Sequence, residues 1–189
     1  MWETGHTPAE WKRSNTILLY KKGDPTDPSN YRPIGLCNSL YKLWTSFIST
    51  TLATFAEEHD LLHNGQEGVR PGRGTQRRIQ QLQATYLHAK RSKSDIYTAY
   101  IDFSSAFNTI SHTQLLHAMS MLGFPNDAIQ IIRNLYVGAS TSITNRSPYF
   151  QTPQIDIKQG VIQGDPLSPL VFTICLDPLL KWLETGDRG

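Results

Sequence analysis

The sequence contains little cysteine and no long apolar run. Its two cysteines, Cys37 and Cys175, lie far apart among the 189 residues, and each sits within apolar sequence. We therefore expect buried free thiols in a reducing compartment rather than a disulfide or a cysteine-based metal site. No apolar stretch reaches the roughly 20 residues of a membrane-spanning helix, and the N-terminus lacks the basic and apolar regions of a secretory signal. An intracellular protein without a membrane partner is expected.

Net charge is also small, at +2, but the charges are distributed unevenly. Residues 66–94 contain a single acid, Glu67, and seven basic residues: Arg70, Arg73, Arg77, Arg78, Lys90, Arg91 and Lys93. A local basic surface in a nearly neutral chain favours an anionic partner, with nucleic acid first. On charge alone, a solvated helix face explains the pattern equally well.

Strand and helix patterns mix without a regular alternation, which predicts an α+β fold. Strands are predicted at 15–20, at 31–37, as a buried strand at 96–103, and within 139–157 around a turn at 145–148. Helices are predicted at 39–58, from a cap at Thr75, from Ser111 to Leu122, from Pro125 to near Gly138, and, as an apolar helix, from Leu170 to about Trp182. Pro33 favours an edge position for its strand. Trp44 and Phe47 are expected in the core.

The strand predicted at 96–103 carries an acidic residue near its end, Asp102, and small residues follow it. A charge in this position is costly unless a cation meets it. The small residues leave their backbone amides accessible, which would suit a metal on the carboxylate and phosphate oxygens on the amides. Phe107 could form a wall of the same pocket. Taken alone, Asp102 could equally cap a turn or pair with a surface lysine.

Four segments carry a resemblance to one family. They are YRPIGLCNSLYK (31–42), QEGVRPGRGT (66–75), YIDFSSAFNTISH (100–112) and KQGVIQGDPLSP (158–169). In order and separation they resemble successive blocks of the reverse transcriptase domain of non-LTR (LINE-type) retrotransposons. The resemblance runs from about Trp11 to Trp182. It implies the fingers and a partial palm of a right-hand RNA-directed DNA polymerase, with fingers at 1–94 and partial palm at 95–189.

The resemblance also implies individual roles. Asp102 matches the catalytic aspartate that binds two Mg²⁺ ions, and the backbone carbonyl of Phe103 would be a further metal ligand. The residues expected to hold the incoming dNTP are Arg32, Lys22, Ser105, Ala106, Phe107, Gln163 and Gly164. The residues expected near the RNA template and DNA primer are Gln66, Arg70, Arg73, Arg77 and Arg78. Family habit would place the protein at nuclear DNA.

The chemistry of these residue types agrees with the implied roles. Phosphoryl transfer needs metals held by carboxylates, cations on the phosphates and accurate positioning. A bulky Phe107 would clash with a 2′-hydroxyl, which favours dNTP over NTP. Simpler alternatives remain open for several positions: Arg32 as an edge-strand surface residue, Lys22 in a solvated turn, Gln163 and Gly164 in a plain turn, and Gln66 as a tie within its loop.

The sequence also departs from the family pattern. Asn108 stands where the family has an acid, and Val69 stands where it has an aromatic residue. The chain contains no Asp-Asp pair and ends at Gly189, before the position of the family's aromatic-X-Asp-Asp strand. One carboxylate cannot hold two Mg²⁺ ions, so we expect a truncated chain that is inactive alone and has an exposed sheet edge beside Asp102.

Two other functions fit parts of the sequence. A non-catalytic, nucleic-acid-binding remnant would keep the basic surface at 66–94 and would bind with a steep salt dependence. An RNA-dependent RNA polymerase shares the palm chemistry, but Phe107 and the Gln163-Gly164 pair argue against it.

Overall fold

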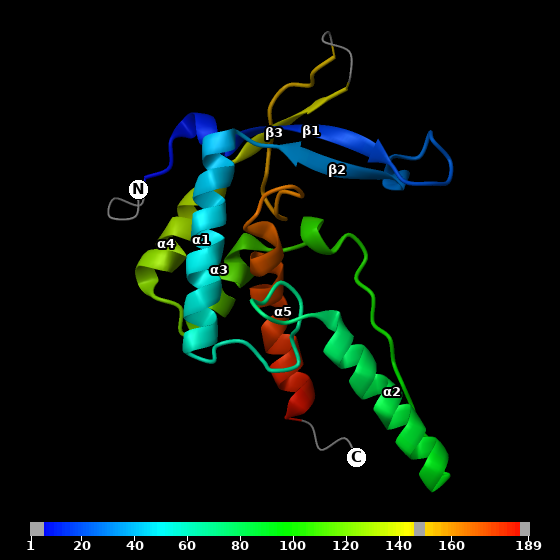
Figure 1. The fold of residues 1–189 in the computed structure, drawn as a ribbon. Coiled ribbons are helices and arrows are strands. Elements are labelled where there is room, and N and C mark those ends of the chain that lie inside the picture. Colours follow the sequence, from blue (N-terminus) through cyan, green and yellow to red (C-terminus); the bar gives the residue numbers. More distant parts are fainter. Residues whose placement is uncertain (1–5, 146–149, 186–189) are drawn as a thin grey trace.

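A small mixed sheet lies across one end of a bundle of helices in the computed structural model, which describes residues 6–145 and 150–185 (Figure 1). The strands are β1 (Arg13–Tyr20), β2 (Tyr31–Leu36), β3 (Ser140–Thr144) and β4 (Ile155–Asp156). The helices are α1 (Ser39–Glu58), α2 (Thr75–Ser92), α3 (His112–Leu122), α4 (Asn126–Tyr136) and α5 (Ser168–Glu184). Three short 3-10 turns occur at Ala9–Lys12, Pro28–Asn30 and Ala106–Asn108. The predicted α+β class is confirmed.

The sheet has the strand order β2-β1-β3-β4. β1 and β2 form an antiparallel hairpin, in which Leu18 is opposite Pro33. β3 pairs in parallel with β1 and antiparallel with β4. Pro33 therefore lies on an edge strand, as expected, where its missing N–H breaks no ladder. Of the turn predicted at 145–148, residues 146–148 lie outside the described residues.

The hydrophobic core lies among α1, α3, α4 and α5. The bounds of α1, α3 and α4 lie close to those predicted, and local capping signals fix the ends of α1 and α3. Asn38 Oδ1 accepts a hydrogen bond from the Leu40 N–H at the start of α1 (2.8 Å), and Ser111 does the same for α3. Gly123 ends α3 in the left-handed region. Within the described part of the chain, every helix is too short or too polar to cross a lipid bilayer.

α1 buries a different stripe from the one expected. Its buried residues are Tyr41, Thr45, Ile48, Leu52 and Ala56. Trp44 is half-buried and Phe47 is 55% exposed, so the prediction that both lie in the core is wrong for Phe47. The helix carries two adjacent apolar stripes, and periodicity alone does not determine which one faces the bundle.

The buried strand predicted at 96–103 is absent. Residues 94–103 have no regular structure, and they run back alongside α2 as an exposed segment (Figure 1). Tyr97 is 94% exposed and Ile101 67%, while the hydroxyl groups of Tyr86 and Tyr100, 3.0 Å apart, link the segment to α2. A strand needs a neighbour to satisfy its backbone groups, and none of the four described strands pairs with this one.

The loop after α1 is fastened to α5 by a buried carboxylate. Asp177 is fully buried and accepts a hydrogen bond from the His63 N–H (2.5 Å). Its other oxygen lies 3.0 Å from Lys181 Nζ, which also donates to the Leu61 carbonyl (2.7 Å). Asp177 thus has a structural role on α5.

Candidate functional site

A cavity of about 420 Å³ opens between β2, the 3-10 turn at 106–108 and the loop that leads into α5. It is lined by Lys21, Arg32, Ser105, Ala106, Phe107, Gln163, Gly164, Asp165, Ser168 and Pro169. The structure thus brings together six of the seven residues expected at a dNTP, from three separate sequence blocks. Lys22 is not among the lining residues, and its neighbour Lys21 takes the expected place. Lys21 N–H donates to the Asn30 carbonyl (2.9 Å) and so continues the hairpin, in which successive side chains point to opposite faces.

The wall formed by residues 105–107 is held from behind. Ser105 has a φ of +53° and opens the 3-10 turn, whose Asn108 N–H donates back to the Ser105 carbonyl (2.8 Å). The Phe107 ring packs on Phe172 of α5, with ring centroids 5.4 Å apart. The Phe107 carbonyl accepts a hydrogen bond from Val161 N–H (2.8 Å). These contacts fix the position of the aromatic ring in the cavity.

The opposite wall is the turn at Gln163 and Gly164, which lies directly against β2. Gly35 N–H donates to the Gln163 carbonyl (2.7 Å). Gly164 has a φ of +109°, and a Cβ there would lie 2.8 Å from the Gly35 carbonyl oxygen, so a glycine is required on both counts. The turn therefore depends on close backbone contact with the edge strand.

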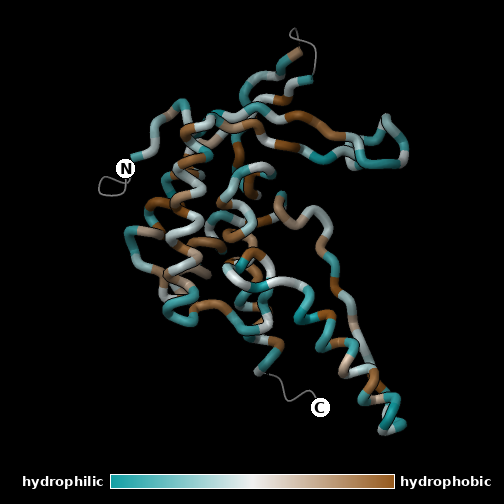
Figure 2. The backbone as a smooth tube through the Cα atoms, in the orientation of Figure 1, coloured by the Kyte–Doolittle hydropathy of each residue, from teal (hydrophilic) through white to brown (hydrophobic). Residues whose placement is uncertain are grey.

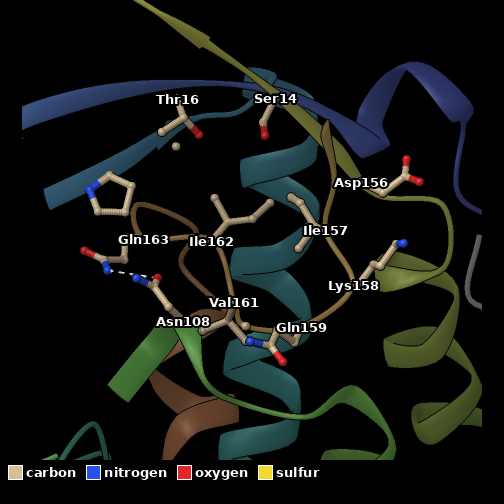
Figure 3. Close-up of a pocket in the computed structure, with 13 residues that line it drawn as sticks. Ser14, Thr16, Asn108, Asp156, Ile157, Lys158, Gln159, Val161, Ile162 and Gln163 are labelled. Atoms are coloured by element: carbon tan, nitrogen blue, oxygen red, sulfur yellow. Dashed lines mark hydrogen bonds between the residues drawn. The ribbon is translucent and has the colours of Figure 1, made fainter. Parts of the chain in front are cut away.

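Gln163 also lines a second cavity of about 350 Å³, which lies beneath β1 and β2 (Figure 3). Gln163 Nε2 donates to Asn108 Oδ1 across 3.4 Å (Figure 3). Asn108 stands where the family has an acidic residue, and its side-chain oxygen keeps the hydrogen-bond acceptor that an acid would also supply.

Asp102 is not brought into the cavity. It is exposed and is not among the lining residues, because the segment that carries it leaves along α2. Phe103, whose carbonyl was expected to bind metal, is 45% exposed. Among residues 6–145 and 150–185, no three His, Cys, Asp or Glu side chains gather closely enough to hold a metal ion.

Arg70 does not lie at the surface, contrary to its expected contact with template or primer. Its side chain is fully buried and forms a two-pronged ion pair with Glu57 (Nε to Oε1, 2.5 Å; Nη2 to Oε2, 2.9 Å). The hydrogen bonds from Arg70 are the main reason why the pKa of Glu57 is held below its ordinary value. Arg70 Nη1 also donates to the carbonyls of His63 (2.8 Å) and Gln66 (3.2 Å). Arg70 therefore organises its loop.

The other predicted template or primer residues differ in exposure. Arg73 is largely covered and lies 3.3 Å from Glu57, and Arg78 lies 3.1 Å from the buried Glu67. Arg77 also faces Glu67 (3.7 Å), but its side chain is 64% exposed. Gln66 is half-buried, and its side chain accepts from Gly68 N–H (3.3 Å), so the alternative of a loop tie describes it well. Acidic partners thus neutralise part of the basic surface.

The sequence interpretation missed Asp165. It lines the cavity although only 3% of the residue is exposed. Burial raises the pKa of its carboxyl, and hydrogen bonds from Thr45, the Leu167 N–H and Tyr41 partly offset this effect. The available sequence signal was its position directly after Gly164.

The profile of the reverse transcriptase (RNA-dependent DNA polymerase) family matches residues 19–187. The retrovirus-related Pol polyprotein from the type-1 retrotransposable element R2 of Popillia japonica is 34% identical over 182 residues, which are 96% of this chain and 25% of that protein. The RNA-directed DNA polymerase from the mobile element jockey of Drosophila melanogaster is 26% identical over 173 residues, 91% of this chain and 19% of that protein.

The chain therefore spans a quarter or less of the length of these two relatives. Its match to the family profile nevertheless covers most of its own length, and the match includes the residues that form the cavity. The chain belongs to the reverse transcriptase family, and its relatives are non-LTR retrotransposon polymerases, as the four sequence blocks predicted.

Proposed function

We propose that this chain supplies the dNTP-binding part of an RNA-directed DNA polymerase, which adds dNTPs to a DNA primer 3′-OH and copies an RNA template. The cavity between β2, residues 105–107 and the Gln163-Gly164 turn carries this proposal. Three sequence blocks with separate expected roles meet there, and together they offer cations, free amides, an aromatic ring and a side-chain amide.

Each wall of the cavity has a part in binding. Arg32 and Lys21 place positive charge where a triphosphate can be held. The guanidinium of Arg32 suits phosphate oxygens in particular, because its N–H donors are fixed in a fork. The amides at Ser105 and Ala106 face the same anion. Phe107 packs under the sugar and excludes a 2′-hydroxyl, and Gln163 offers a donor and an acceptor to the nascent base pair.

Reverse transcriptases generally use divalent metal ions, and the oxygen donors here suit Mg²⁺. These donors are the exposed carboxylate of Asp102 and the carbonyl of Phe103, which lie in the segment before residues 105–107 and do not line the cavity. When bound, two Mg²⁺ ions would supply positive charge at the attacking and leaving oxygens. A single carboxylate does not hold two ions, so we propose that Asp102 acts with further acidic residues and that the 189-residue chain alone does not extend primers.

We assign the sheet and its basic hairpin to the fingers of a right hand. Because β3 pairs with β1, the fingers in this proposal include residues 140–156 as well as residues from 1–94, and the partial palm is the remainder of 95–189. Template and primer would lie along Arg73, Arg77 and Arg78, of which Arg77 is the most exposed.

The proposal is tested by titrating dGTP with Mg²⁺ into the chain and measuring affinity by NMR. Arg32→Ala should weaken binding about tenfold, because a charge-assisted phosphate contact is lost. Arg13→Ala removes a β1 arginine outside the cavity and should leave the affinity unchanged. Equal affinities for wild type and Arg32→Ala would contradict the site. RNA binding with a steep salt dependence but without dNTP binding would favour the non-catalytic remnant.

Sugar selection by Phe107 is tested in a chimera in which this chain replaces the matching segment of the Popillia japonica relative. Phe107→Ala should allow incorporation of ribonucleotides, because the ring that excludes the 2′-hydroxyl is removed. Phe150→Ala, a half-exposed phenylalanine elsewhere, is the control. Unchanged dNTP preference in a primer-extension assay would refute the role of Phe107 as a steric gate.

A further inference from the structure

Asp165 is an acidic residue buried directly behind the Gln163-Gly164 turn. Its Oδ1 accepts a hydrogen bond from the Leu167 N–H (3.3 Å), and its Oδ2 accepts one from the Tyr41 hydroxyl (3.3 Å). The Thr45 hydroxyl faces both this carboxylate and the Lys42 carbonyl oxygen, from which it lies 3.3 Å. Tyr41 and Thr45 both belong to α1, so the carboxylate joins the turn to that helix.

A carboxylate at this buried position costs free energy that simple packing does not require. Removing it from water is unfavourable, and its direct partners are hydroxyl groups and an amide rather than a cation within hydrogen-bond distance. The buried Tyr136 hydroxyl nearby has no hydrogen-bond partner among the described residues. Burying these polar groups therefore costs desolvation free energy, which an apolar residue at position 165 would avoid.

The turn is anchored on its other side by β2. β2 is an edge strand, and the Gly35 N–H points away from β1 to the Gln163 carbonyl (2.7 Å). Gly164 lies so close to Gly35 that a Cβ would not fit. The turn is thus held between β2 on the cavity side and α1 behind it, and Asp165 provides the α1 side.

We propose that Asp165 is a positioning residue that holds the Gln163-Gly164 turn against β2 and so sets the shape of the wall that faces the nucleotide. The ligand named here rests on the proposed function, whereas the anchoring of the turn does not. Asp165 acts through Gln163 and Gly164 and need not touch the substrate.

The anchoring is measured by hydrogen exchange of the Gly35 amide. Asp165→Ala should accelerate exchange at Gly35 at least about tenfold more than at Ile132, a fully buried residue within α4 whose amide reports general stability. Asp165→Asn should restore most of the protection, because its side chain keeps an acceptor for Leu167 N–H and a polar group for Tyr41. Asp95→Ala, in the exposed segment after α2, is the control.

The consequence for the ligand is measured by the dGTP and Mg²⁺ titration. Asp165→Ala should weaken binding about tenfold, Asp165→Asn should bind within about threefold of wild type, and Tyr41→Phe should fall between them. If wild type binds no dGTP, the proposed function fails, while exchange at Gly35 still decides the anchoring. Parallel acceleration at Gly35 and Ile132 in both Asp165→Ala and Tyr41→Phe would overturn the proposal, as would an unchanged dGTP affinity in Asp165→Ala.

Discussion

At the scale of single residues, Arg70 donates five hydrogen bonds to acceptors at the end of α1 and in the loop that follows it. Two go to the Glu57 carboxylate and three to backbone carbonyls of the loop. The planar guanidinium suits this arrangement because its donors are fixed in a fork. A buried charge of this kind stabilises the fold only while its partner is present.

We expect Glu57→Gln to lower the free energy of unfolding by about 3 kcal/mol, because Arg70 then stays buried without a counter-charge. Glu58→Gln removes the adjacent exposed acid and should change stability by less than about 0.5 kcal/mol. Urea denaturation of the three proteins measures the difference. Equal denaturation midpoints for the two variants would show that Arg70 finds another partner.

The same pair should make stability depend on pH. Arg70 holds the pKa of folded Glu57 below its ordinary value of 4.5. The unfolded chain therefore binds the proton first as pH falls, so the contribution of Glu57 is fully present above pH 4.5 and is lost below it. Stability measured from pH 6 to about pH 3 should fall less steeply in Glu57→Gln than in wild type. Identical slopes would exclude this linkage.

At the scale of elements, the sequence predicted those features that depend on residues close together in the chain. Asn38, Ser111 and Gly123 fix helix ends by contacts within a few residues, and the cavity residues were found because their blocks resemble a family. The burial of Arg70 and Asp165 escaped prediction, because it depends on Glu57 and Tyr41, which are distant in sequence. The strand at 96–103 was predicted from side chains alone, although a strand also needs a neighbour.

α2 is only weakly anchored to the rest of the fold. Of its 18 residues only Ala89 is buried, whereas α4 buries six of its 11 residues. We expect the amides of α2 to exchange with solvent much faster than those of α4, because little burial resists local opening. Hydrogen exchange followed by NMR tests this, and equal protection in the two helices would contradict it.

At the scale of the whole molecule, apolar side chains lie at the surface as well as in the core. Figure 2 shows hydrophobic positions along the segment that returns beside α2. Ile96, Tyr97, Tyr100 and Ile101 are all at least 39% exposed there. An extended apolar segment with unpaired backbone groups is prone to pair with another chain.

We expect the isolated chain to self-associate through this segment. The double variant Tyr97→Lys with Ile101→Lys should lower the association, because lysine on an exposed edge opposes strand pairing. The double variant Met121→Lys with Leu43→Lys adds the same two charges at positions 72% and 69% exposed, on α3 and α1, and serves as the control. Light scattering at matched concentrations measures the effect. An equal fall in association with Met121→Lys and Leu43→Lys together would indicate that net charge, not this segment, governs association.

The parallel pairing of β1 with β3 has a consequence for synthesis on the ribosome. Thr141 bonds to Ser14 across 127 residues of sequence. At roughly 5–20 residues per second, translation would take about 6–25 seconds to cover that distance. Throughout that interval the nascent β1–β2 hairpin has one side of β1 open, so early chaperone contact at β1 would protect the sheet until its third strand emerges.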